Sequence, residues 1–368
     1  MMDLSNIFIG KKVVQRAYYR DALLYKSNGW QTLPSTFQKL FTKNYNMGTF
    51  RAATTDLDNY LYIATSGGCI SKLDPDGNII WQKSYISDWT DVDLKISNNK
   101  IFCIFVLANG TTVGQLQCLV IDVNGKQIAN YEFEKIFNCR VDMRNATFDD
   151  ENIYISISLS EPKKKYILKM DYNGNIVSKK ELNNLESLPI ISTNNGPYLY
   201  AGFYEKDGDD KRKIIRYSKN NFDNNVVFNY KIGAGGSPIQ ISIDNNDDFI
   251  VAVDATVMKA EGESGKELWI ANGYAFSLAI DSQNNIYSFS STTNTTSKKD
   301  FFLKKISSDG TKIWQIDNEF PVLDYYKDVV MPLPGRVIVD KHDNIYCIYT
   351  DTAGNLEIKK FINLVKEQ

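Results

Sequence analysis

Few side chains of this 368-residue sequence have the types and spacing that support chemistry. His342 is the single histidine, which excludes a metal centre with several imidazole ligands and catalysis by more than one histidine. Its context, DKHDNIY, is typical of a surface turn, and a lone general base is the alternative. No two cysteines form a CxxC pair, and apolar runs such as IFCIFV predict buried, reduced thiols. The cysteines are Cys69, Cys103, Cys118, Cys139 and Cys347.

An acidic segment, DPDGN, has the spacing of the first ligands of a calcium loop. It contains Asp74, Asp76 and Asn78. An EF-hand loop also needs a bidentate glutamate at its twelfth position, and that position holds Tyr85. We therefore predict a tight turn closed by side-chain hydrogen bonds, with a weak cation site as the alternative. No resident metal or cofactor is expected.

Two glycine-containing segments could belong to catalytic or phosphate-binding motifs, GESG (262–265) and GAGGSP (233–238). The first is half of the G-x-S-x-G arrangement of a nucleophilic serine, but no apolar strand precedes it. The second could hold a phosphate on its backbone N–H groups, but no helix with GK[ST] follows. Both are predicted to be loops. No catalytic residue is assigned, and the chain is not expected to be an enzyme.

Two further features could bind a surface polymer. The basic runs EPKKKYILK (161–169) and KKDFFLKK (298–305) favour solvated strand faces, and contact with anionic cell-wall polymers is the alternative. Trp89, in SDWTDVD, lies outside the repeats described below. Packing is the favoured interpretation of its side chain, and stacking on a sugar is the alternative.

Composition narrows the class of protein. The chain has 42 Lys+Arg against 44 Asp+Glu, a formal charge of -2, which argues against a general nucleic-acid binder. With 43% hydrophobic and 23% charged residues, it has the composition of a globular protein. The sequence contains no run of 18 apolar residues, so no transmembrane helix is expected. No secretory signal is visible at the N-terminus.

A repeat of about 47 residues runs through most of the chain. Each copy has an Asp/Asn cluster followed by an apolar–aromatic–apolar strand, as in DKHDNIYCIY (340–349). The aromatic or equivalent positions are Tyr62, Phe102, Tyr154, Tyr200, Ile250, Tyr287 and Tyr346. This period is typical of the blades of a β-propeller.

Between these copies lies a second pattern, in which two strands flank a turn with Asp-Gly or Asn-Gly character. Three copies place a tryptophan four residues after the turn glycine, which predicts that the indole packs between adjacent blades. These tryptophans are Trp81, Trp269 and Trp314.

Together the two patterns predict an all-β fold, a seven-bladed β-propeller with four antiparallel strands in each blade. The predicted units are 50–84, 92–133, 140–182, 188–231, 237–271, 274–317 and 335–364. The last unit lacks its outer strand, and residues 37–46 are predicted to supply it and close the ring. The fourth unit is degenerate, so six or eight blades remain alternatives.

The second pattern resembles the pyrroloquinoline-quinone-type propeller repeats, whose blades carry a D-x-x-x-G-x-x-x-W signature. LDPDGNIIW, EGESGKELW and ISSDGTKIW match it best. Other copies depart from it, because Ala129 and Ser178 occupy the tryptophan position. The resemblance implies blade packing rather than a cofactor.

Residues 1–36 are predicted to form a separate attachment segment and linker before the propeller, which spans 37–368. Residues 6–27 resemble a short β segment of bacteriophage tail and baseplate proteins, which contractile tailocins (R-type bacteriocins) share. The matching positions include Val13, Val14, Tyr18, Leu24 and Tyr25. The family has Gly where this chain has Arg20.

The resemblance implies a non-enzymatic structural protein of a phage or tailocin tail, attached through its N-terminal segment. Its expected partners are other tail or baseplate proteins and a host-surface polysaccharide or protein, and a homo-oligomer stays open. It would be made in the cytoplasm, assembled into the particle and released by lysis. Two alternatives are an intracellular propeller scaffold for assembly and a glycan-acting enzyme with paired carboxylates at the propeller channel.

Overall fold

The structure, a computed structural model, is built from β-strands throughout the part of the chain that it describes. The described residues are 16–19, 22–26, 37–86, 89–107, 115–133, 139, 141–182, 187–205, 211–230, 240–253, 256–272, 275, 277–293, 298–316, 319–320, 322–324, 335–351 and 354–363. No helix among them is long and apolar enough to cross a membrane.

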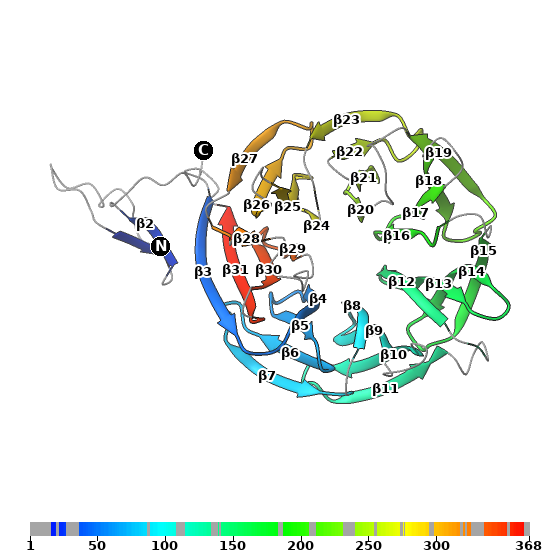
Figure 1. The fold of residues 1–368 in the computed structure, drawn as a ribbon, viewed down its shortest axis with the longest axis horizontal. Coiled ribbons are helices and arrows are strands. Elements are labelled where there is room, and N and C mark those ends of the chain that lie inside the picture. Colours follow the sequence, from blue (N-terminus) through cyan, green and yellow to red (C-terminus); the bar gives the residue numbers. More distant parts are fainter. Residues whose placement is uncertain are drawn as a thin grey trace.

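The strands from β3 onward form seven antiparallel sheets arranged radially around a centre, a seven-bladed β-propeller (Figure 1). The first strand of each blade is innermost. Blade 1 is β4 (Phe50–Thr55), β5 (Leu61–Thr65), β6 (Cys69–Leu73) and β7 (Ile79–Ser84). Blade 2 is β8 (Trp89–Ser97), β9 (Lys100–Leu107), β10 (Gln115–Asp122) and β11 (Gln127–Glu132). Blade 3 is β12 (Val141–Phe148), β13 (Asn152–Leu159), β14 (Lys164–Asp171) and β15 (Ile176–Leu182).

The other four blades have shorter inner strands. Blade 4 is β16 (Ile190–Thr193), β17 (Tyr198–Glu205), β18 (Lys211–Ser218) and β19 (Asn225–Tyr230). Blade 5 is β20 (Gln240–Ile243), β21 (Phe249–Val253), β22 (Thr256–Ala260) and β23 (Glu267–Asn272). Blade 6 is β24 (Ser277–Ile280), β25 (Ile286–Thr293), β26 (Lys298–Ile306) and β27 (Lys312–Ile316), with β28 (Val322–Asp324) added on β26. Blade 7 is β29 (Arg336–Val339), β30 (Ile345–Thr350), β31 (Leu356–Asn363) and β3 (Phe37–Tyr45).

The ring is closed by β3, as the sequence predicts. This strand pairs with β31 from Phe37↔Asn363 to Tyr45↔Leu356, so the outer strand of the last blade comes from the start of the ring. Closure removes the open sheet edge that the three-stranded seventh unit would otherwise expose. The seven predicted units match the observed blades to within three residues at each end, and the alternatives of six or eight blades are excluded.

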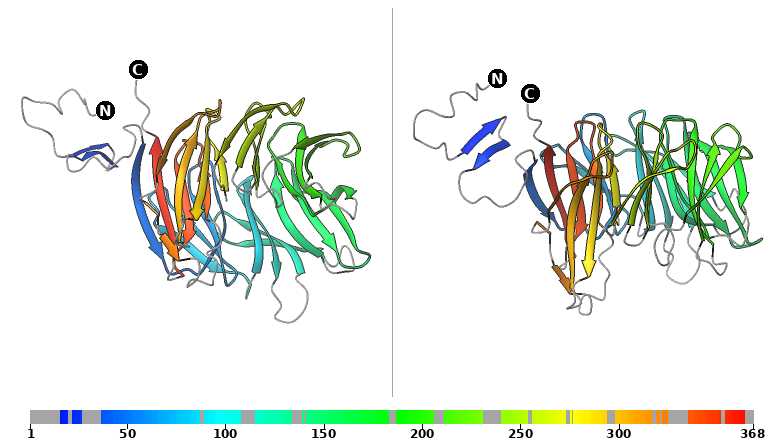
Figure 2. Two further views of the ribbon diagram at one scale, coloured as in Figure 1. Left: turned by 45° about the horizontal axis from the view of Figure 1, so that its top comes forward. Right: turned by 90° about the horizontal axis from the view of Figure 1, so that it is seen from above.

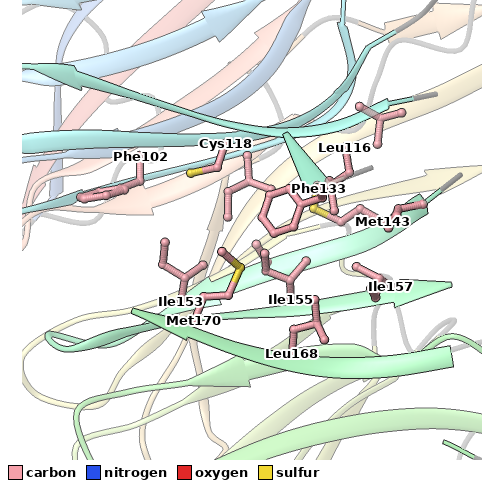
Figure 3. Close-up of a cluster of buried hydrophobic side chains, with 14 of the residues drawn as sticks. Phe102, Leu116, Cys118, Phe133, Met143, Ile153, Ile155, Ile157, Leu168 and Met170 are labelled. Atoms are coloured by element: carbon pink, nitrogen blue, oxygen red, sulfur yellow. The ribbon is translucent and has the colours of Figure 1, made fainter. Parts of the chain in front are cut away.

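Burial follows the position of a strand within its blade. The second strand packs against neighbouring blades on both faces, and every residue of β5, β21 and β30 is buried. The outermost strand borders solvent, and most residues of β7 are exposed. Between blades 2 and 3, Phe102, Phe133, Met143 and Leu168 belong to one buried cluster (Figure 3). These interblade clusters form the core of the ring.

The ring has two different faces. The turns between first and second strands and between third and fourth strands open on the same side, which we call the turn face. The opposite side, the loop face, carries the other connections, including those between blades. Blade 6 extends beyond the ring on the loop face (Figure 2).

On the turn face, an aspartate closes the first turn of most blades. In blade 7, the Asp340 carboxylate accepts the backbone N–H groups of His342 and Asn344, each at 2.9 Å, and Tyr346 Oη donates to its second oxygen at 3.3 Å. The turn residue Asp343 has φ 59°, a conformation that Asn and Asp tolerate better than other non-glycine residues. The Asp/Asn–x–Tyr repeat of the sequence therefore encodes a turn and its anchor.

The second turns join adjacent blades. Trp81 Nε1 donates to Val123 O of blade 2, and Trp269 Nε1 donates to Ser308 O of blade 6, both at 3.0 Å. Trp314 is buried in a cluster that includes Cys347 of blade 7. The three tryptophans thus lie between blades, where the sequence places them.

An N-terminal hairpin, β1 (Arg16–Tyr19) and β2 (Ala22–Lys26), lies outside the ring (Figure 1). Tyr18, Leu24 and Tyr25 fall on its strands, and only their backbone is described. Val13 and Val14 lie outside the described residues. The attachment role of these residues stays a prediction.

Candidate functional site

Trp89 does not lie on the surface, so the packing interpretation is confirmed and the possible role in stacking on a sugar is wrong. Its ring is fully buried, and its centre is 5.2 Å from that of Phe105. Its Nε1 donates to Thr65 O of blade 1 at 2.6 Å. The inner strand β8 begins at Trp89, three residues before the predicted unit, and therefore carries the indole into the interface between blades 1 and 2.

The DPDGN segment is a turn whose carboxylate is used by its own backbone. Asp74 Oδ1 accepts the N–H groups of Asp76 at 3.0 Å and Asn78 at 2.7 Å, and Oδ2 accepts the Asn78 amide at 2.9 Å. Burial raises the pKa of Asp74, but these hydrogen bonds outweigh that effect and hold the pKa below 3.8. Among the described residues, no group of three or more His, Cys, Asp or Glu side chains is placed to hold a metal ion.

The candidates for a general base, a nucleophilic serine and a phosphate loop occupy turns or lie outside the described residues. His342 lies in the first turn of blade 7. GESG (262–265) is the turn between β22 and β23, and GAGGSP (233–238) lies outside the described residues. The five cysteines are unpaired, and all but Cys139 are buried.

The feature with the geometry of a binding site is the central channel, a cavity of about 480 Å³ lined by the inner strands of the blades. Its volume lies in the range of small-molecule sites. The charged side chains among its described lining residues are Arg51, Asp93, Arg144 and Arg336. Asp93 is the single carboxylate among them, so the described lining does not supply the acid pair that the glycan-acting alternative requires.

One register position of the inner strands forms a ring around this channel. It lies four residues before the turn Asp/Asn, or before Ser97 in blade 2, and most of its polar side chains form hydrogen bonds between blades. Asn145 exchanges two hydrogen bonds with the backbone of Ile191, at 2.8 and 3.0 Å, and Gln240 does the same with Leu278, at 3.2 and 2.7 Å. The position is occupied by Ala52, Asp93, Asn145, Ile190, Gln240, Ser277 and Arg336. The bonds of Asn145 and Gln240 satisfy backbone groups at the inner edges of blades 4 and 6.

Asp93 links three blades at this position. One carboxylate oxygen pairs with Arg336 Nη2 of blade 7 at 2.8 Å, and the other accepts the N–H of Ala146 in blade 3 at 2.9 Å. Arg336 is 38% exposed and Asp93 12%, so the pair lies at the wetted wall of the channel. The carboxylate is committed to protein partners on both oxygens.

Arg51 and Arg144 lie one residue further from the turn, at β-bulges. The register of β4 shifts between Phe50 and Ala52, and that of β12 shifts between Met143 and Asn145. Each arginine is thus the extra residue of its strand, and a bulge re-aims a side chain relative to the regular pleat. Arg144 is solvent-exposed, and Arg51 is half-buried with no hydrogen-bond partner at its Nε.

A second cavity, of about 270 Å³, lies on the turn face between blades 3 and 4. Two of its lining charges form an ion pair, because Lys219 Nζ is 2.8 Å from the Asp149 carboxylate and both side chains are buried. Burial raises the pKa of Asp149, but the Lys219 ammonium and two backbone N–H groups outweigh this effect. The pKa of Asp149 is therefore lower than that of an ordinary aspartate. This cluster is part of the blade packing.

The ring and its channel define the chain as a seven-bladed β-propeller protein. No protein-family model matches the sequence, and none of the curated proteins compared with it is significantly similar. Solved structures do match, in 713 chains.

Three of these structures are a protein of unknown function from Bacteroides caccae, BamB from Moraxella catarrhalis and Raptor from Chaetomium thermophilum. The first is 16% identical, with a TM-score of 0.47 over 71% of this chain and 94% of that chain. BamB is 13% identical, with a TM-score of 0.47 over 96% of this chain and 94% of that chain. Raptor is 10% identical, with a TM-score of 0.60 over 90% of this chain and 29% of that chain. At such identity the Raptor match shows the propeller fold alone.

Proposed function

We propose that this chain is a binding protein of a phage or tailocin tail, attached through its N-terminal segment and using the propeller to contact a partner. The observation that carries the proposal is the division of the chain at Phe37. The ring is complete from β3 onward, and the β1–β2 hairpin lies outside it (Figure 1). A hairpin that the ring does not need is available for attachment.

The positions of the chain ends within the ring support a division in which attachment uses one face of the ring and partner binding uses the other. Phe37 pairs with Asn363, at the place in blade 7 where the other blades have their turn between third and fourth strands. The attachment segment therefore leaves from the turn face. The connections between blades and the β28 extension lie on the loop face (Figure 2), which can face outward to a partner.

Truncation at two positions tests this proposal. Chains lacking residues 1–36 and 1–46 are produced in source cells induced with a DNA-damaging agent, and sedimented particles are analysed by mass spectrometry. We expect the full chain to co-sediment with tail proteins. The chain lacking 1–36 should keep its thermal unfolding midpoint but stay in the supernatant.

The longer deletion is the control for ring integrity. It removes β3, exposes β31 as a sheet edge and should abolish cooperative unfolding. Failure of the full chain to sediment in an induction that yields particles would contradict tail attachment and favour an intracellular scaffold. Unfolding of the chain lacking 1–36 would show that the segment belongs to the propeller.

A further inference from the structure

Arg51 and Arg144 line the channel, and no carboxylate among the described residues neutralises either of them. No ion pair of either side chain is formed with the described residues, and the nearby carboxylate of Asp93 already binds Arg336 and the N–H of Ala146. The described lining thus carries three guanidiniums and one carboxylate, with two positive charges unbalanced. Walls of low dielectric strengthen the potential of such a cavity.

The placement of these charges is specific to one half of the ring. The inner strands of blades 4–7 have four residues each and no register shift, whereas β4 and β12 are longer and carry the two bulged arginines. Bulges are enriched beside functional sites, where they aim a side chain that the regular pleat would place elsewhere. The neighbouring residues Ala52 and Asn145 keep the regular ring position, so the arginines are additional to the packing pattern.

We infer that the central channel binds a small organic anion that carries a phosphate or carboxylate group, with Arg51 and Arg144 as its cationic contacts. A guanidinium presents a planar fork of donors that matches the oxygens of both groups. The cavity of about 480 Å³ accommodates a ligand the size of one charged sugar. The inference concerns the ring alone and is independent of particle attachment.

Calorimetric titration of the purified full chain tests this inference. The probes are glucose 6-phosphate and glucuronate, with glucose as the neutral control and inorganic phosphate as the minimal anion. We expect at least one charged sugar to bind, glucose not to bind, and added salt to weaken the affinity. Preference for glucose 6-phosphate identifies a phosphate ligand, and preference for glucuronate identifies a carboxylate ligand. Absence of binding by all the anions would overturn the inference.

Two variants locate the site. Arg144→Gln and Arg51→Gln should each weaken binding by about tenfold or more, because each removes a charge-assisted contact. Lys126→Gln is the control, since it removes one positive charge from an exposed turn-face residue, and it should leave the affinity unchanged. Equal losses in all three variants, or no loss in either arginine variant, would overturn the inference. Arg144 is exposed, so its variant decides the test if Arg51→Gln fails to fold.

Discussion

The turn face and the channel wall of this propeller are built from the same strands but differ in how their polar groups are used. On the turn face, carboxylates such as Asp74 and Asp340 accept hydrogen bonds from their own turns, and the buried Lys259 pairs with Asp244 at 2.6 Å and Asp248 at 3.2 Å. On the channel wall, Arg51 and Arg144 have no ion pair with the described residues. The satisfied face therefore holds the blades together, and the unsatisfied wall is suited to a ligand.

The turn face and the channel wall also differ in how regularly their structure repeats from blade to blade. Turns of the same kind recur in blade after blade, whereas the inner strands range from four to nine residues and shift register in blades 1–3. A repeated turn preserves interblade contacts that every blade needs. An irregular inner strand can add a charged side chain without disturbing them. If this contrast is correct, turn-face variants should lose stability and channel variants should lose binding.

The largest loss of stability is expected from Lys259→Met. The Lys259 side chain is 4% exposed and that of Asp244 is fully buried, so the variant leaves a buried carboxylate without the lysine cation. Removing one partner of such a pair costs about 3–5 kcal/mol. Urea unfolding followed by circular dichroism measures the change.

The matched channel variant is Arg336→Gln, which also breaks an ion pair. In this variant Asp93 keeps the hydrogen bond from the Ala146 N–H, and water can solvate the carboxylate oxygen that Arg336 bound. We therefore expect the free energy of unfolding to fall by about 1–2 kcal/mol. A loss as large as that of Lys259→Met would show that the channel wall holds the ring as strongly as the turn face does.

The fold could be predicted because its determinants are local and repeated. The Asp/Asn turn and the Tyr strand are a few residues apart, and their period of about 47 residues counts the blades. The closing strand could be predicted because the last repeat lacks its fourth strand. The alternative of sugar stacking by Trp89 was wrong, because the inner strand β8 starts earlier than the repeat indicates and buries the indole.

The channel could be predicted only in part. The ring position four residues before the turn is a usable signal, but it holds Asp93, Asn145, Gln240 and Arg336, which share a place and not a residue type. The two bulges shift the arginines by one residue from this position. Spacing along the sequence does not show a bulge, because the extra residue is accommodated by pairing between strands.

Gly310→Ala tests the contact between adjacent blades, and its expected loss of stability is smaller than that of Lys259→Met. Gly310 has φ +91°, and an added Cβ would lie 2.6 Å from Trp269 Cγ of the preceding blade. The control is Gly354→Ala, because Gly354 has a similar φ of +84° but no atom within 4 Å of an added Cβ. The left-handed conformation costs about 1–2 kcal/mol in both variants.

The additional loss in Gly310→Ala measures the blade contact, and we expect it to be about 1 kcal/mol from the forced movement of the indole. Differential scanning calorimetry of both variants gives the comparison. Equal midpoints would show that Trp269 moves away without cost and that the contact contributes nothing.

The smallest effect is expected from Asp74→Asn, and its pH dependence separates a turn from a cation site. The pKa of Asp74 is held below 3.8, so its carboxylate stabilises the fold above that pH and ceases to do so as the pH falls through the lowered pKa. We therefore expect Asp74→Asn to cost less than about 1 kcal/mol at pH 7, and the difference from the parent chain to shrink below about pH 4. Asp76→Asn, in the same turn, is the control, because its exposed side chain should be replaceable at either pH. A rise in stability on adding calcium, lost in both variants, would instead assign these carboxylates to a ligand and remove the contrast between the two faces.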